Sequence, residues 1–382
     1  MTIDKCDKRI KNKIIIINSD RRTLAARILK IAHALEKGGY NIEVLTWDRM
    51  CEANTNEYVN GIKVHNLRLK VPDYGLWVLP FYFFWWLYVA AYLTKNSAVG
   101  YHPLNLYNLL PTIPLKFIKK VKIIYDLTDF TADSFNFNCS VRYFMSKLEN
   151  YCLNWVDGLI IVDSHRINQI DPNNIKHMSI IMNTPDDKYE KFKFIDRYYT
   201  FTIYCGGWIS QTRGIGEICE AASQINGIEL IIAGFGQAEI YYKKLYEKYK
   251  NIHFVGLLSK EDSLIQTHKS DLICAFYDPK IPINRLASPN KLFDAMMCGR
   301  PILSNSEAVP VAKVINEEKC GILIPYADID QIVTAILQLK KDVALANYMG
   351  HNGRNAFLEK YDWSIMEKRL IDLYKNVYGG FS

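Results

Sequence analysis

The stretch from Ala287 to Leu303, ASPNKLFDAMMCGRPIL, holds the residues of this chain whose types and spacing best suit ligand chemistry. Ser288 is a favourable N-cap residue, and Pro289 suits the first helical position because its ring presets the backbone angle. A helix is therefore predicted to begin at this point. Its first turn leaves backbone N–H groups without partners, and these groups together with the helix dipole favour an anion.

Three polar residues share one face of this helix. Asn290 and Asp294 are four residues apart, and Lys291 and Asp294 are three apart. Lys291 adds a positive charge at the helix start, while the Asp294 carboxylate, one turn later, could accept hydrogen bonds from sugar hydroxyls. This combination indicates a nucleotide-sugar site. The alternative is an amphipathic helix whose apolar face is buried and whose Asp294 is merely solvated.

Glycines recur at the carboxyl ends of the strands predicted in the second half of the chain. In doubly wound parallel sheets ligands bind at this edge, and glycine lets the backbone approach a phosphate or a base. A single glycine is more often only a tight turn, so the recurrence at one edge is the stronger argument. The glycines concerned are Gly206, Gly207, Gly234, Gly236 and Gly256.

Three residues of the first half are candidates for acid–base or acceptor contacts. Asp126 and Asp129 end a predicted strand, although each could equally cap a helix or form a turn. His102 follows another predicted strand, and taken alone it is a loop histidine. Asp328 and Asp330 imitate a metal-binding Asp-x-Asp pair, but Asp328 comes just before a helical pattern and is predicted to be its N-cap. No metal site is predicted.

The length and composition of the chain limit the classes of protein to which it can belong. The 382 residues exceed one ordinary core and predict two domains. The net charge of +7 is modest, and no block of Lys and Arg alternates with aromatic residues, so nucleic acid is not an expected partner. Nine cysteines without a Cys-x-x-Cys pair argue against a disulfide framework or a zinc site and favour a reducing cytoplasm. The charged N-terminus lacks an apolar signal-peptide core.

Strands and helices alternate through the first half, as in a parallel sheet. The loop after the first strand contains Asp20 and Arg22 and opens a helix whose apolar residues repeat at helical spacing up to Gly38-Gly39. This βαβ unit lacks the GxGxxG turn of dinucleotide-binding proteins, so a Rossmann-like fold is predicted without bound NAD. An amphipathic helix is expected near Val141 to Val156. The predicted strands are Ile14 to Ile17, Ile42 to Thr46, Val121 to Tyr125, Gly158 to Val162 and Met178 to Met182.

The second half repeats this alternation after a polar stretch, Asp186 to Tyr199, that is interpreted as a linker. The domains are accordingly placed at 1–190 and 199–362, and the C-terminal residues 363–382 are expected to form a helix that packs back on the first domain. The fold class is α/β, with two doubly wound parallel sheets. The predicted strands are Thr202 to Cys205, Glu229 to Ala233, His253 to Gly256, Leu272 to Phe276, Pro301 to Ser304 and Gly321 to Ile324.

The segment from Tyr74 to Thr94 contains no charged residue and is rich in aromatic residues. Its length would allow a membrane span, but Pro80 interrupts it and a span would divide the sheet. A helix lying in the membrane interface is a second interpretation, supported by five nearby lysines. A helix buried in the core or facing a partner is the third. The lysines are Lys95, Lys116, Lys119, Lys120 and Lys122.

Five motifs of the second half, in this order, resemble the donor domain of glycosyltransferase family 4. The first half resembles the acceptor domain of that family more loosely, through the Asp20 and Arg22 loop, GYNIEVLTW (39 to 47), His102 and IIYDLTD (123 to 129). The resemblance implies a GT-B fold, two Rossmann-like domains facing across a cleft, and a retaining transferase that uses a nucleoside-diphosphate sugar. The second-half motifs are YCGGWISQTRGI (204 to 215), LIIAGFG (230 to 236), HFVGLL (253 to 258), SDLICAFY (270 to 277) and SPNKLFDAMMCGRPIL (288 to 303).

The resemblance also implies roles for particular residues. It places His102 near the donor sugar, Asp126 and Asp129 on the acceptor side, and Arg213 and Lys291 near the diphosphate. The donor-binding residues that it implies are Gly206, Gly207, Arg213, Gly234, Gly236, Gly256, Leu257, Ser288, Pro289, Asn290, Lys291 and Asp294.

Two departures from the family pattern stand out. The family usually has two glutamates eight positions apart at this helix, where this chain has Leu286 and Asp294. It also commonly has an arginine where this chain has Trp208. A subgroup with a Ser-Pro-x-Lys element, in which Lys291 and Asp294 carry the contacts, is the closer match.

The sequence thus predicts a glycosyltransferase of the hexosyltransferase type that needs no cofactor beyond its sugar donor. The expected partners are a nucleotide-sugar donor, a glycan or polyprenyl-linked acceptor and, through 74–94, a membrane. The protein is expected in the cytoplasm at the inner face of the cell membrane, in cell-surface polysaccharide or glycoconjugate synthesis. Three alternatives remain open: a nucleotide-sugar 2-epimerase of the same fold, a glycan phosphorylase, and a non-catalytic nucleotide-sugar-binding partner of an assembly complex.

Overall fold

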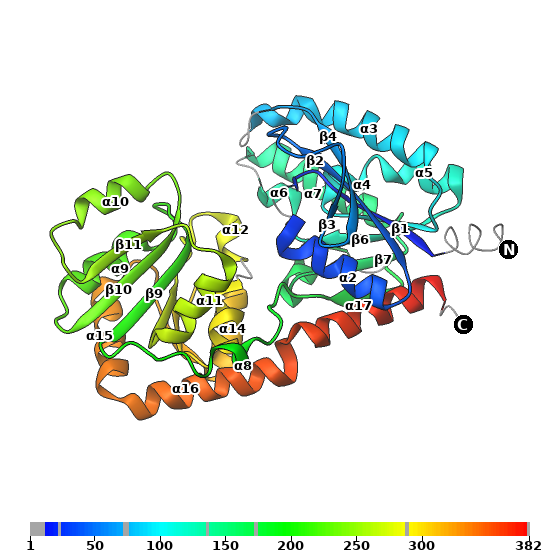
Figure 1. Ribbon diagram of the computed structural model, residues 1–382. Coiled ribbons are helices and arrows are strands. Elements are labelled where there is room, and N and C mark those ends of the chain that lie inside the picture. The colour runs from blue at the N-terminus through cyan, green and yellow to red at the C-terminus, as the bar shows by residue number, and fades with distance from the viewer. Residues whose placement is uncertain are drawn as a thin grey trace. The chain divides into compact units, whose positions relative to one another are not determined.

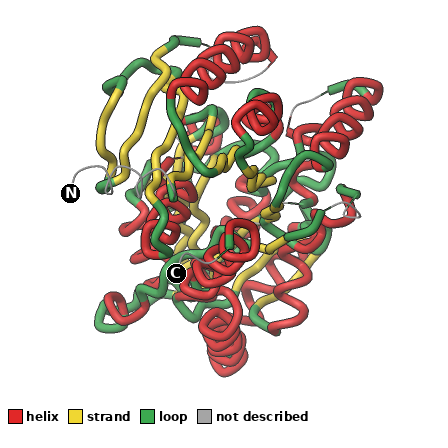
Figure 2. Tube along the Cα trace, turned by 90° about the vertical axis from the view of Figure 1, so that its right-hand side faces the viewer, coloured by secondary structure: helices red, strands yellow, loops and turns green. Residues whose placement is uncertain are grey.

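The computed structural model of this protein describes residues 12–21, 24–71, 76–134, 137–171, 175–286 and 290–379. The chain forms two compact units, Met1–Met182 with Met366–Ser382, and Asn183–Ile365. Each unit has a sheet of parallel strands with helices on both of its faces (Figure 1), and Figure 2 shows the strands of each sheet running between helices. The predicted α/β class with two doubly wound parallel sheets is confirmed.

In the described part of the first unit, eight strands form one sheet in the order β3-β4-β2-β1-β5-β6-β7-β8. Neighbouring strands are parallel, except that β3 and β4 form an antiparallel hairpin. The chain order reverses beside β1, so the carboxyl end of β1 is a topological switch point, where ligands of such sheets bind. The strands are β1 (Lys13–Asn18), β2 (Asn41–Asp48), β3 (Asn56–Val59), β4 (Ile62–Arg68), β5 (Gly100–Pro103), β6 (Lys122–Leu127), β7 (Gly158–Ile161) and β8 (Met178–Ile180).

Both faces of this sheet are apolar because helices cover both. Ile15 and Ile17 of β1 share a core with Trp85 and Val89, and the alternate residue Ile16 is fully buried on the opposite face. The first helix begins as a π-helix, Leu24–Ile28, which continues into α2 (Leu29–Lys37). The other helices are η3 (Leu76–Phe81), α3 (Tyr82–Lys95), α4 (Leu106–Leu109), α5 (Thr112–Lys119), α6 (Thr131–Ser134), α7 (Cys139–Leu153) and η4 (Ser164–Gln169).

The C-terminal helix α17 (Trp363–Tyr378) packs on strands of the first unit from Met366 onward. A methyl group built on Gly100 of β5 would lie 1.7 Å from the Tyr378 hydroxyl oxygen, and one built on Gly158 of β7 would lie 3.1 Å from Val377. Glycine at these two positions therefore lets the helix lie close against the strands.

The segment that the sequence singled out for its aromatic residues forms η3, which contains Pro80, and then α3; Tyr74 and Gly75 lie outside the described residues. One face of α3 belongs to the core, where Trp85 is fully buried and its Nε1 donates to Asn108 Oδ1 at 2.8 Å. The stretch Trp77–Lys95 is long and apolar enough to cross a bilayer by length and composition, and 28% of it is buried. Large apolar side chains are exposed on its other face: Trp77 (80%), Phe83 (58%), Phe84 (54%) and Leu87 (54%).

In the second unit, the described residues form a six-stranded parallel sheet in the order β11-β10-β9-β12-β13-β14. Its strands are β9 (Phe201–Trp208), β10 (Ile228–Phe235), β11 (Ile252–Gly256), β12 (Leu272–Ala275), β13 (Ile302–Asn305) and β14 (Gly321–Ile324). Its helices are α8 (Tyr189–Phe192), α9 (Ile215–Ser223), α10 (Glu239–Leu245), α11 (Lys260–Lys269), α12 (Pro282–Arg285), α13 (Asn290–Met297), α14 (Val309–Glu318), α15 (Ile329–Lys341), α16 (Val343–Ala356) and the π-helix Phe357–Tyr361.

Candidate functional site

A cavity of about 280 Å³ lies in the second unit beside the carboxyl end of β9 and the start of α13. Five of the residues predicted to bind a donor line it together: Gly206, Gly207, Asn290, Lys291 and Asp294. Ser288 and Pro289, the predicted cap and first residue of this helix, lie outside the described residues, and the described helix begins at Asn290. The amino end of α13, where the helix dipole is positive, therefore borders the cavity.

Lys291 lies directly over the glycine pair of β9. A methyl group built on Gly207, whose φ is +124°, would lie 2.9 Å from Lys291 Cε and 3.1 Å from Lys291 Nζ. Only a residue without a side chain leaves this space to the ammonium group. The strand end and the lysine thus form a compact, positively charged wall of the cavity, which suits a phosphate group.

Asp294 lies on the cavity side of α13, while the residues on the other sides of the helix are buried. Its side chain is largely buried, with a residue exposure of 7%, and its Oδ2 accepts a hydrogen bond from Lys260 Nζ at 2.6 Å. Lys260 begins α11 and is itself mostly exposed. The carboxylate therefore presents a charged acceptor to the cavity, paired with a lysine that solvent can reach.

The cavity also has a floor that the sequence did not predict. Tyr204, two residues before Gly206 on β9, donates or accepts a hydrogen bond with Ser263 Oγ at 3.0 Å. Burial raises the pKa of Tyr204 to about 12, so its phenol stays protonated and can donate a hydrogen bond to a ligand. Thr267 and Ile273 complete this floor. The i, i+4 spacing of Ser263 and Thr267 could have shown that they share a helix face.

The other predicted glycines serve backbone contacts at the same sheet edge. A methyl group on Gly234, at φ +139°, would lie 1.8 Å from the Gly207 carbonyl oxygen, and one on Gly236 would lie 2.2 Å from the Ile209 carbonyl oxygen. Gly256 has a φ of +75°, and a methyl group built on it would meet none of the described neighbouring atoms within 4 Å; Leu257 after it is 71% exposed. These residues do not line the cavity, and their contact with a donor stays a prediction.

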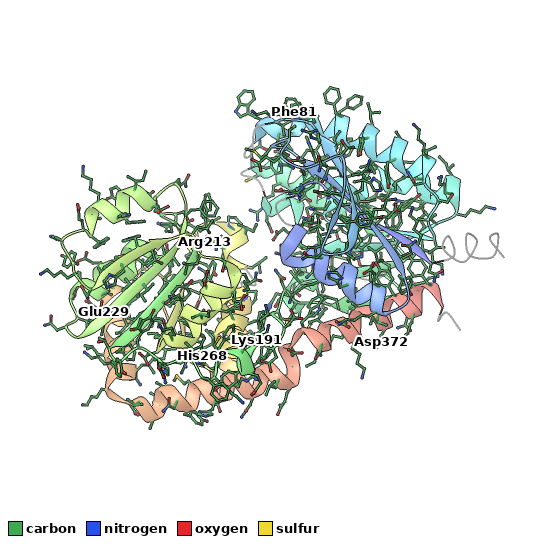
Figure 3. All side chains as sticks on the ribbon, viewed as in Figure 1. Phe81, Lys191, Arg213, Glu229, His268 and Asp372 are labelled. Carbon is green, nitrogen blue, oxygen red and sulfur yellow. The ribbon has the colours of Figure 1, made fainter. Side chains whose placement is uncertain are left out.

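Arg213 lies in the loop after β9, on the side of the second unit toward which the strands point, whereas Glu229 marks the opposite end of β10 (Figure 3). Its guanidinium carbon is 4.8 Å from the centre of the Tyr277 ring, a cation–π contact, and Arg213 is not among the residues that line the cavity. Trp208, at the end of β9, is 39% exposed and packs edge-on against Phe235 with ring centres 5.0 Å apart.

In the first unit the prediction that His102 follows a strand is wrong, because His102 lies within β5 and is fully buried. Its Nδ1 shares a hydrogen bond of 2.6 Å with the Tyr374 hydroxyl of α17, and its Nε2 is 3.5 Å from Asp126 Oδ2. Asp126 is also fully buried, and Arg27 donates to both of its oxygens, at 2.8 and 2.9 Å.

Burial acts to raise the pKa of Asp126, but Arg27 and His102 outweigh it and hold that pKa below its usual value. Neither His102 nor Asp126 offers surface to a ligand in this structure, so either could act on a substrate only through a neighbour. Asp129 differs, because its carboxylate is 47% exposed and accepts from the buried Arg166 at 3.0 Å.

Among residues 12–21, 24–71, 76–134, 137–171, 175–286 and 290–379, no three His, Cys, Asp or Glu side chains are grouped as they would be to hold a metal ion. The Asp-x-Asp pair belongs to a helix start as predicted, since Asp328 Oδ1 accepts from the Gln331 N–H at 3.0 Å and is the N-cap of α15.

Comparison with known proteins finds similarity to glycosyltransferases, and it includes a family match within the second unit. Residues 200–342 match the family described as Glycosyl transferases group 1. The capsular polysaccharide biosynthesis glycosyltransferase CapM of Staphylococcus aureus is 22% identical over 259 residues, which are 62% of this chain and 66% of that protein.

Two solved structures have the same fold. The sucrose-phosphate synthase of Thermosynechococcus elongatus superimposes with a TM-score of 0.76 at 14% identity, covering 97% of this chain and all of that one. The Anabaena protein HepE in complex with UDP-glucose superimposes with a TM-score of 0.68 at 13% identity, covering 95% of this chain and 99% of that one. Together with the two parallel sheets, these likenesses confirm the predicted GT-B fold.

Proposed function

We propose that this protein is a retaining glycosyltransferase that moves a sugar from a nucleoside-diphosphate sugar to a glycan or lipid-linked acceptor. The observation that carries the proposal is the second unit's cavity, where Lys291 covers Gly207 and Asp294 presents a buried carboxylate edge. The positive charge of Lys291 suits a diphosphate. The neighbouring carboxylate of Asp294 can accept hydrogen bonds from the hydroxyl groups of a ribose. The match of residues 200–342 to group 1 glycosyltransferases supports the same conclusion.

A uridine nucleotide is the first donor to test, because HepE of the same fold was solved with UDP-glucose. In our proposal the diphosphate lies against Lys291, Gly206 and Gly207, and Asp294 accepts hydrogen bonds from the ribose. Donor binding would then draw Lys260 away from Asp294 or hold it beside the nucleotide. Arg213 at the same sheet edge is a second candidate cation for the diphosphate.

The reaction needs a group that stabilises the leaving diphosphate, which gains negative charge as the bond to the sugar breaks. We assign this role to Lys291 and the backbone N–H groups around Gly206 and Gly207, with no cofactor beyond the donor and no resident metal ion. These groups are fixed before the reaction, so they need no reorganisation as the charge develops.

We place the acceptor on the first unit and the protein at the inner face of the cell membrane, in cell-surface polysaccharide synthesis. The exposed face of α3 supports this placement, since aromatic residues beside lysines are typical of helices that lie in the interface of an anionic membrane. From Leu76 to Tyr125 the sequence holds five lysines and no acidic residue. The capsular role named for CapM supports the same pathway class.

Product analysis tests the proposed function. The protein is incubated with UDP-glucose and other nucleotide sugars, with and without membrane extract as acceptor, and the products are separated and their anomeric configuration is read by NMR. Transfer with retained configuration is expected. An epimerised sugar nucleotide would instead identify a 2-epimerase, and tight binding without turnover would identify a non-catalytic binding protein.

A further inference from the structure

Arg49 of the first unit is a buried arginine that forms no ion pair with a carboxylate of the residues that the structure describes. It follows the carboxyl end of β2 and keeps 8% of its surface exposed. Its Nη2 donates to the Ser19 carbonyl oxygen at 2.9 Å and to the Tyr82 hydroxyl at 3.0 Å. The guanidinium also lies over two rings, 4.9 Å from the centre of Trp47 and 5.8 Å from that of Tyr82.

These contacts leave most of the guanidinium's hydrogen-bonding capacity unused. An arginine has five N–H donors, and among the described residues only the Nη2 donors of Arg49 have acceptors. The Nε atom is buried and makes no hydrogen bond to this part of the chain. A buried charge without a counterion costs free energy unless it is paired, and a cation–π contact offsets only part of that cost. Arg49 therefore keeps both a positive charge and free N–H donors with which it can bind an anion.

Two acidic residues on the neighbouring strands, Asp48 of β2 and Glu57 of β3, have partners of their own. Both oxygens of the neighbouring Asp48 accept backbone N–H groups, from Met50 at 3.2 Å and Ala53 at 2.7 Å. Glu57 is paired with Arg21 at 2.8 Å. From Tyr82, whose hydroxyl and ring contact Arg49, to Tyr125 the sequence holds no acidic residue. Within the described residues, the hydrogen bonds and ring contacts of the Arg49 side chain are therefore to neutral groups.

The location suits a substrate. Arg49 and Ser19 follow the carboxyl ends of β2 and β1, two adjacent parallel strands, and β1 is the switch point of the sheet. Ser19 Oγ also shares a hydrogen bond of 3.2 Å with the Tyr82 hydroxyl, so both neighbours of Arg49 are held in place. The outward face of α3, the helix that Tyr82 begins, is the aromatic face described above.

We infer that Arg49 binds a phosphoryl group of the acceptor, with the Ser19 and Tyr82 contacts orienting its guanidinium. Arginine suits this role because its planar donors match phosphate oxygens and its charge is permanent. The assignment of the phosphate to the acceptor rests on the function proposed above, whereas the binding of an anion at Arg49 does not. The phosphate could belong to a lipid-linked acceptor or to a soluble sugar phosphate.

Hydrogen exchange measured by mass spectrometry tests this inference, because it reports each unit separately. Pyrophosphate is the probe, and peptides covering 12–21 and 41–53 report on Arg49, while peptides covering 201–214 and 290–298 report on the donor cavity. In the wild-type protein we expect pyrophosphate to slow exchange at both places. Arg49→Met should remove the effect at 12–21 and 41–53 and leave it at 201–214 and 290–298, raising the apparent dissociation constant at the first pair by about tenfold or more.

Two further variants keep the test decisive if Arg49→Met folds poorly. Arg49→Lys keeps the charge without the planar donors and should weaken the protection partly. Arg68→Met is the matched control, since Arg68 ends the next strand, β4, is exposed, and donates to the Cys51 carbonyl oxygen. Protection that survives in Arg49→Met, or that is lost equally in Arg68→Met, would overturn the inference. A purely structural Arg49 would lower the melting temperature on substitution and leave the protection unchanged.

Two further ligands, added to the same exchange experiment, identify the molecule that carries the phosphate. Phosphatidylcholine vesicles carrying a small fraction of polyprenyl phosphate, compared with plain vesicles, test a lipid-linked acceptor, and glucose 1-phosphate tests a soluble one. Arg49-dependent protection by either supports the inference and identifies the source. Protection by neither contradicts an acceptor phosphate at this site. Absence of pyrophosphate protection at 201–214 and 290–298 alone would instead count against the proposed donor site.

Discussion

Lys291 is the residue on which the proposed chemistry depends most. If its ammonium meets charge that develops only as the diphosphate leaves, Lys291→Ala should lower kcat about a hundredfold, with a small change in KM. Steady-state kinetics with purified donor measures both constants. Activity should also persist in EDTA, because the proposed stabilising groups belong to the protein.

Lys243→Ala on α10 is the control for this prediction, since it removes an exposed lysine from the same unit. Its kinetics should match those of the wild type. If Lys291→Ala raised KM and left kcat unchanged, Lys291 would bind the donor equally well in the ground state and in the transition state. If EDTA abolished the activity and magnesium or manganese restored it, the proposed metal-free mechanism would be wrong.

Glu149 makes stability depend on pH. Its carboxylate is buried and accepts from the Tyr125 hydroxyl at 2.6 Å and the Thr131 N–H at 2.8 Å, yet burial outweighs these bonds and raises its pKa to about 7. The folded state therefore binds this proton more tightly than the unfolded state. The stability from protonated Glu149 is present below the ordinary glutamate pKa and is lost as pH rises through 7.

Urea titrations at several pH values measure this effect. From pH 5 to 8 the wild type should lose up to about 3 kcal/mol of unfolding free energy relative to Glu149→Gln, which cannot ionise. Glu261→Gln, an exposed change on α11, should follow the wild-type curve. Parallel curves for the wild type and Glu149→Gln would show that burial does not perturb this carboxylate.

The sequence predicted which residues of α13 lie together beside the cavity but not what surrounds them. Lys291 and Asp294 could be found because their charge and helical spacing are local properties. Lys260, which pairs with Asp294, is 34 residues away, and no local pattern links them. Arg27 did leave a signal, since it follows Leu24 by three residues on the buried face of its helix.

At the scale of elements, the proposal assigns the exposed aromatic face of α3 to contact with the membrane. Trp85 is unsuitable for testing it because its side chain is fully buried, whereas Phe83 and Phe84 are more than half exposed. Replacing both with serine should reduce binding to anionic vesicles by about tenfold or more, since each aromatic ring contributes apolar surface to the interface. Vesicle flotation measures the bound fraction.

The control for α3 is the double change Ile240→Ser and Tyr241→Ser on α10, which removes exposed apolar residues from the second unit. It should leave flotation unchanged. Equal binding of the wild type and the Phe83, Phe84 variant would favour a partner-facing or purely structural role for α3.

The strands were predicted well where they are buried on both faces, because continuous β-branched runs such as Ile14 to Ile17 are their signature. Strand ends were missed, since β9 continues to Trp208 through glycines that carry no strand signal. The hairpin of β3 and β4 was also missed, although its Asn60-Gly61 turn, with φ of 49° and 85°, is a strong hairpin signal.

At the scale of the whole molecule, the C-terminal helix is an integral part of the N-terminal unit. Tyr374 is fully buried, packs edge-on against Tyr40 at 5.2 Å and holds His102. Tyr374→Ala should therefore lower the unfolding free energy by about 3–5 kcal/mol. Hydrogen exchange should rise across residues 12–182 and stay unchanged across the second unit's sheet.

Tyr348→Ala on α16 is the matched control, because Tyr348 is 59% exposed. It should change neither region. Equal protection of the first unit in Tyr374→Ala and wild type would show that the strands hold together without this helix.

The most direct test of the donor site is a calorimetric titration with UDP, GDP, ADP and CMP. The wild-type protein should bind one of these nucleotides, and Asp294→Asn should bind it about tenfold more weakly, since a charge-assisted hydrogen bond to the ribose is lost. Asp262→Asn, an equal charge change at the start of α11, should bind as the wild type does. Failure of every nucleotide to bind, or unchanged affinity in Asp294→Asn, would contradict the assignment of this cavity as a nucleotide-sugar site.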